Sequence, residues 1–160
     1  MSTRCNIKIT DDKKTYYLYR HWDGYPAETG AHVLEIAEAI NHPAWENGYA
    51  SKALQAVNRF FGKIRHNEND DSYRSHYELT ERPHGDIEHF YHIEFLPDSK
   101  VWIGYAKGYG PKLENETVPY VPEMFKMIVN DERKYMNRNL EIMKEENPGV
   151  YDQYEPYPML

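Results

Sequence analysis

The sequence predicts an α+β fold in which an antiparallel sheet of about five strands carries two or three helices packed on one face. Short alternating, aromatic-rich runs typical of strands lie on both sides of a pair of amphipathic segments. The regular strand–helix–strand alternation of a parallel sheet is missing. The chain of 160 residues has the length of one domain. We therefore expect a single domain over residues 1–149 and an extended Tyr/Pro-rich tail over residues 150–160.

The first two strands are expected at residues 5–10 and 15–21, where apolar and polar residues alternate on either side of a polar turn. Antiparallel pairing about that turn places residues 4–5 opposite residues 20–21. The next segment, residues 22–26, contains Asp-Gly and Pro and is expected to break the second strand.

Two helices are expected at residues 31–41 and 50–65, because apolar residues recur there every three or four positions. His42-Pro43 is expected to end the first, since the residue before a proline is disfavoured in helical geometry.

The second half of the chain predicts three more strands and a long helix. Strands at residues 75–80, 86–95 and 101–105 are expected to form an antiparallel meander in which Ile87 shares a face with His89. The helix is expected to begin at Pro122 and to run to about residue 145. Its apolar face would consist of Val121, Phe125, Ile128, Tyr135, Leu140 and Met143.

Composition excludes several classes of function. The single cysteine, Cys5, excludes an internal disulfide and any cysteine-based metal centre, and a lone thiol suits a reducing cytoplasm. The net charge of −7 argues against general nucleic-acid binding. The N-terminus has no secretory pattern and no apolar run is long enough for a membrane span, so we expect a cytoplasmic protein without membrane contact.

Neither a metal nor a cofactor is expected. His76, His84, His89 and His92 fall close together in the sequence, but their spacing matches no metal-binding motif. The glycines of residues 104–110 match neither phosphate-loop pattern.

The strongest candidate for a ligand-binding site is the end of the first hairpin. Titratable, cationic and aromatic side chains converge there on one turn, and turns at strand ends are where binding groups commonly sit. Two interpretations stay open, because Asp23-Gly24 is also ordinary turn chemistry and the aromatic rings would also close the end of a core. Strand alternation further predicts that Arg20 and His21 face opposite sides. The candidate residues are Arg4, Arg20, His21, Trp22, Asp23 and Tyr25.

The same segment resembles a widespread family of small phage and prophage proteins. The resemblance rests on Ser2-Thr3-Arg4, Asn6-Ile7, Tyr19, the run His21–Tyr25, and Gly30. It covers roughly the first 35 residues and implies a viral origin and a location in the host-cell cytoplasm. It implies no reaction, so no catalytic residue is assigned.

These observations favour a phage or prophage accessory protein that binds or inhibits a host component, with a host or phage protein as its partner. Tyrosine and tryptophan are favoured interface residues, and the chain contains 15 Tyr. The alternative is a small nucleotide- or phosphate-ligand-binding protein or hydrolase that uses Arg4, Arg20, His21 and Asp23. A structural or virion accessory domain is the third hypothesis.

Overall fold

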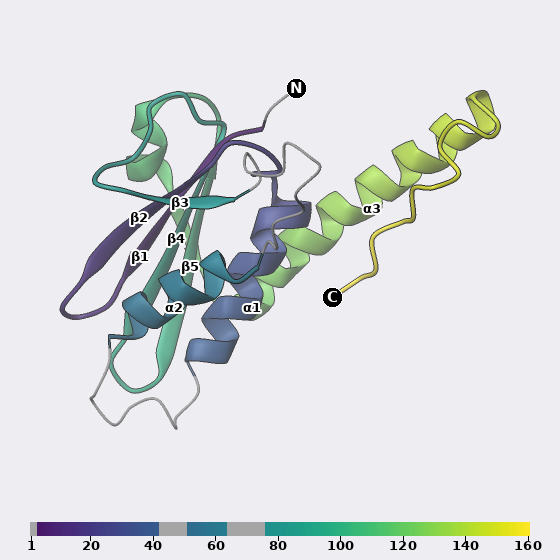
Figure 1. Ribbon diagram of the computed structural model, residues 1–160. Coiled ribbons are helices and arrows are strands. Elements are labelled where there is room, and N and C mark those ends of the chain that lie inside the picture. The colour runs from purple at the N-terminus through teal and green to yellow at the C-terminus, as the bar shows by residue number, and fades with distance from the viewer. Residues whose placement is uncertain (1–2, 42–50, 64–75) are drawn as a thin grey trace.

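The computed structural model describes residues 3–41, 51–63 and 76–160 and confirms an α+β fold (Figure 1). Its centre is a six-stranded sheet with the strand order β3-β2-β1-β4-β5-β6. The strands are β1 (Cys5–Thr10), β2 (Thr15–Arg20), β3 (Tyr77–Thr80), β4 (His89–Leu96), β5 (Lys100–Lys107) and β6 (Val118–Tyr120). The helices are α1 (Ala31–Ile40), α2 (Lys52–Phe61) and α3 (Pro122–Glu146), with a π-helical turn η1 (Pro26–Gly30) and a 3-10 turn η4 (Pro111–Glu116).

The sheet is mixed, whereas an antiparallel sheet was expected. The β1–β2 hairpin has the expected register, with Cys5 opposite Arg20. On its other side, β1 pairs in parallel with β4, and Cys5 lies opposite His89. All other neighbours are antiparallel. Turn signals in the sequence fix only hairpin pairs that are adjacent in the chain, so the direction in which one hairpin meets the next is set by tertiary packing.

The predicted meander of the three later strands is wrong for β3. This strand pairs with β2, and Tyr17 lies opposite Thr80. β4 has β1 on one edge and β5 on the other, so β3 cannot pair with it. β3 instead lies along the outer edge of β2.

The three helices cover one face of the sheet, which we call the helix face (Figure 1). Successive strand residues point to opposite faces, so alternate apolar residues of β1, β2, β4 and β5 meet α1, α2 and the first half of α3 there. The side chains that fill this core include Cys5, Ile7, Ile9, Leu18, Tyr91, Ile93, Phe95 and Ile103 from the sheet and Val33, Ile36, Phe60 and Phe125 from the helices.

The opposite face, called the far face, is covered in part by η4. A smaller core lies there, formed by Tyr19, Ile87, Phe90, Ala106 and Leu113. Ile87 was expected on the face of His89. It lies on the far face because β4 begins only at His89, so strand alternation does not extend back to residue 87.

Helix α3 leaves the body of the protein partway along its length (Figure 1). Phe125, Val129 and Arg133 are its buried residues. Tyr135 and Met143 were expected on its buried face, but they are 64% and 37% exposed. They lie beyond the point at which the body ends, so no sheet remains to cover them. We call residues 134–146 with residues 150–160 the arm, because the tail runs back along this half of α3 (Figure 1).

Parts of the expected elements lie outside the described residues. They are Ala50 and residues 64–65 of the second predicted helix, the His42-Pro43 stop and the beginning of the strand at residue 75. Over the described ranges, no helix combines the length and the apolar character that a membrane span requires.

Candidate functional site

The turn after β2 divides its side chains between the two faces of the sheet. Arg20 points into the helix face and is 3% exposed. Its Nη1 donates to Thr29 Oγ1 at 2.8 Å and to the Tyr77 hydroxyl at 3.1 Å, and its guanidinium lies 4.8 Å from the centre of the Tyr77 ring. Arg20 is therefore a structural part of the core on that face.

Asp23 and Gly24 close the end of the sheet. Asp23 has a φ of 59°, and its carbonyl oxygen accepts hydrogen bonds from both Arg20 and Thr29. A Cβ on Gly24 would lie 2.8 Å from both Cys5 Cβ and Thr3 O, which is closer than such atoms approach. The turn at these two positions is therefore packed directly against the start of β1.

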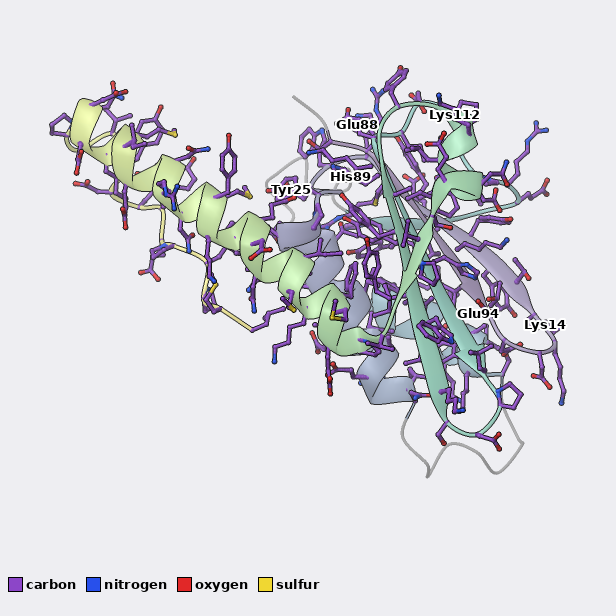
Figure 2. All side chains as sticks on the ribbon, turned by 180° about the vertical axis from the view of Figure 1, so that it is seen from behind. Lys14, Tyr25, Glu88, His89, Glu94 and Lys112 are labelled. Carbon is purple, nitrogen blue, oxygen red and sulfur yellow. The ribbon has the colours of Figure 1, made fainter. Side chains whose placement is uncertain are left out.

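Tyr25 joins this turn to the C-terminal tail. Its hydroxyl donates to Asp23 Oδ1 at 3.2 Å and lies 3.5 Å from the hydroxyl of Tyr157, which donates to Glu28 at 2.6 Å. Burial raises the pKa of Tyr25 to about 12, so this phenol stays protonated at neutral pH. Figure 2 shows Tyr25 beside α3, at the end of the sheet where β4 begins.

On the far face, five side chains form a group that we call the Arg4 cluster. Arg4 Nη1 pairs with Asp86 Oδ2 at 2.9 Å, and Arg4 Nε makes a long hydrogen bond of 3.4 Å to His21 Nδ1. The Tyr19 hydroxyl lies 2.8 Å from the same His21 nitrogen. The Tyr19 ring stacks on His84, with centroids 3.8 Å apart. The cluster thus combines an ion pair with stacked rings on one surface.

Asn6 holds this cluster in place. Its side-chain amide donates to the carbonyl of His84 at 2.8 Å and accepts from the His84 N–H at 3.2 Å. Asn6 is fully buried, so both of its hydrogen bonds are shielded from water. These two hydrogen bonds hold the segment that contains His84 and Asp86 against the far face.

The predicted site residues are therefore only partly brought together. Arg4 and His21 share the far face, and Trp22 is half-buried with its ring centre 6.4 Å from that of His21. Arg20 belongs to the opposite face, as strand alternation predicts.

Sequence reasoning missed Tyr19, His84 and Asp86 as members of the cluster. No local spacing links the last two to residues 19–21. One signal was the presence of both Asn6 and Tyr19 among the residues on which the resemblance rests.

The geometry of the cluster sets the hydrogen-bonding roles of its members. An arginine Nε only donates, so His21 Nδ1 accepts and the proton of the neutral ring lies on Nε2. The Asp23 carboxylate accepts from the Tyr25 hydroxyl at Oδ1. The Arg4 charge is matched by the half-exposed Asp86.

A second polar group lies farther along the far face. Glu114 Oε1 accepts from Lys8 Nζ at 3.1 Å and from the Tyr17 hydroxyl at 2.8 Å. The Thr10 hydroxyl lies 2.8 Å from His92 Nε2. Within the described ranges, no group of three or more histidine, cysteine or acidic side chains is arranged to hold a metal ion.

Comparison with known proteins identified no relative of this chain. No protein-family model, no curated protein and no solved structure matches the chain.

Proposed function

We propose that the chain is an accessory protein of a phage or prophage that acts by binding a host protein, through the far-face surface formed by the Arg4 cluster and Trp22. The phage assignment rests on the resemblance of the first 35 residues. The binding role rests on where the residues of that resemblance lie, because some are on the helix face and others are on the far face.

That division is the observation that carries the proposal. Arg20 and the Asp23 carbonyl make hydrogen bonds inside the protein, and Gly24 packs against the start of β1. Arg4 and Asp86 instead keep 31% and 51% of their side-chain surface exposed. An ion pair beside half-buried aromatic rings is typical of the centre and rim of a protein interface, where Trp, Tyr and Arg contribute most of the affinity.

A nucleotide- or phosphate-binding protein, or a hydrolase of such a ligand, is the second candidate. Arg4 and His21 lie together and would offer two donors to an anion. It is the weaker candidate, because Arg20 is held on the opposite face and Asp86 already neutralises Arg4.

The experiment compares what the tagged wild-type chain and three variants retain from host lysate. Arg4→Glu and His21→Ala alter the cluster, while Lys13→Glu makes a matched charge reversal at an exposed position of the β1–β2 turn. We expect one host protein to be retained by the wild type and by Lys13→Glu, and about tenfold less by each cluster variant, since central interface residues typically contribute that much or more.

The melting temperature of each variant separates binding from folding. Reduced capture at an unchanged melting temperature supports the proposal. Equal capture by all four proteins contradicts it, and native mass spectrometry that finds a phosphate-bearing small molecule on the wild type alone favours the second candidate.

A further inference from the structure

The C-terminal tail covers one side of α3 and leaves the opposite side open. Asn137 makes two hydrogen bonds with the main chain of Tyr157, and Asn130 makes two with that of Leu160. Arg133 donates to the Pro158 carbonyl and lies over the Tyr157 ring. The tail therefore occupies the side of α3 from which these three side chains project.

Apolar residues lie on the side opposite to the tail. Residues three, four and seven apart share a face of a helix, which groups six side chains that we call the arm stripe: Met124, Ile128, Asp131, Tyr135, Arg138 and Ile142. Met124 is 51% exposed, Tyr135 is 64% exposed and Ile142 is 45% exposed. These three side chains leave apolar surface exposed on one side of α3, and larger exposed apolar patches mark interaction sites.

The outer half of α3 has little of the tertiary packing that stabilises most helices in proteins. Arg133 is the last buried residue of α3, and from residue 134 to residue 146 every side chain is half-buried or exposed. Isolated helices shorter than about 12–15 residues are marginal in water, because most helical stability in proteins comes from tertiary packing.

Part of the arm stripe is arranged symmetrically about Tyr135. Ile128 lies seven residues before Tyr135 and Ile142 lies seven residues after it. Asp131 lies four residues before Tyr135 and Arg138 lies three residues after it, so the opposite charges are within one residue of equal distance. In an antiparallel pair, the isoleucines and the opposite charges therefore come close to one another.

We propose that the arm stripe pairs with the arm stripe of a second copy of this chain, antiparallel, about a two-fold axis at Tyr135. Ile128 of each copy then packs against Ile142 of the other, and Asp131 of each copy meets Arg138 of the other. A parallel pairing would instead bring Asp131 against Asp131 and Arg138 against Arg138. A two-fold axis requires such a self-complementary surface.

The reach of the arm fits this arrangement. The seven residues from Tyr135 to Ile128 or Ile142 span about 11 Å at 1.5 Å per residue, so residues 135–142 of the partner lie along residues 128–135 of this copy. The tip of the partner's arm approaches Val121 and Val118 beside the base of α3, which are 40% and 51% exposed. The proposed contact does not use the Arg4 cluster, so it stands independently of the proposed function.

Sedimentation and light scattering of the full chain test the pairing. The wild type is expected to have twice the monomer mass of 19.0 kDa. Tyr135→Glu is expected to weaken dimerisation about 100-fold at an unchanged circular dichroism spectrum, since it places two like charges on the axis. Lys126→Glu, an exposed change on the same helix but away from the stripe, is the matched control and stays dimeric.

Charge exchange and cross-linking test the orientation. Asp131→Arg and Arg138→Asp are each expected to weaken the dimer, and the double variant is expected to restore it. In oxidised mixtures, Asp131→Cys is expected to cross-link with Arg138→Cys, and neither with itself, while Cys5 is fully buried. A wild type that is monomeric up to about 100 µM, a dimer unaffected by Tyr135→Glu, or self-linking of either cysteine variant overturns the proposal.

Discussion

The two halves of α3 have similar helical sequences and opposite environments. Up to Arg133 the helix packs on η1, α1 and β5, and Phe125 and Val129 are fully buried. Beyond it every side chain is half-buried or exposed, and Tyr135 and Ile142 are among the exposed ones. The comparison shows that periodicity predicts a helix, whereas the body of the protein decides which side of it is buried and where along the helix burial ends.

The largest effect on stability is expected when one aromatic residue in each half of α3 is replaced by alanine. Phe125→Ala is expected to lower the free energy of unfolding by about 3–5 kcal/mol, because it leaves a cavity in the core. Tyr135→Ala is expected to change it by less than about 0.5 kcal/mol per monomer at protein concentrations below the dimer range. Urea denaturation followed by circular dichroism measures both. Similar losses for the two variants would show that the halves are not distinct.

Low pH is expected to destabilise the body rather than α3, because the strongly buried histidines lie in the body and α3 contains none. Burial lowers the pKa of His32, His89 and His92 to about 4. The unfolded chain, with histidine pKa values near 6.5, then binds more protons than the folded chain between pH 6.5 and 4, so stability falls as the pH falls through that window.

Between pH 6.5 and 5 we expect the free energy of unfolding to drop by about 2–3 kcal/mol in total, allowing for partial solvent screening. His89→Gln, which keeps a hydrogen-bonding group beside Tyr105, is expected to remove about 1 kcal/mol of that drop. Denaturant midpoints at each pH measure it. A profile parallel to that of the wild type would mean that His89 is protonated in the folded protein.

The smallest expected effect is at the tail. Asn130→Ala with Asn137→Ala removes four hydrogen bonds between α3 and residues 157 and 160, at a cost of about 1 kcal/mol or less because the sites are partly exposed. Hydrogen exchange at the Tyr157 and Leu160 amides should speed up, while Asn139→Ala, an exposed position on the same helix, should leave it unchanged. If both variants exchange alike, the asparagines do not hold the tail.

Local signals predicted most of the elements and little of their assembly. Alternation located β1, β2, β4 and β5, and Pro122 is the first residue of α3, as the sequence predicted. The parallel pairing of β1 with β4 and the place of β3 at the β2 edge carry no local signal, because both join segments far apart in the chain. The short β6 and the η1 and η4 turns were missed for lack of length and periodicity.

The candidate site shows the same limit. Alternation correctly separated Arg20 from His21, and the hairpin register placed Cys5 opposite Arg20. The partners that complete the Arg4 cluster, His84 and Asp86, come from a segment more than sixty residues away. Only the fold brings them there, through the buried amide of Asn6.

The parallel pairing of β1 with β4 also determines when β1 can complete its pairing during translation. Residues 89–94 must leave the ribosome before the second edge of β1 has a strand to pair with, 84 positions after Cys5. At about 5–20 residues per second, that interval lasts about 4–17 seconds. During it, the second edge of β1, along Ile7 and Ile9, stays unpaired while α1 and α2 are being synthesised. Slow translation of residues 21–88 would therefore lengthen the period in which this chain is most open to aggregation.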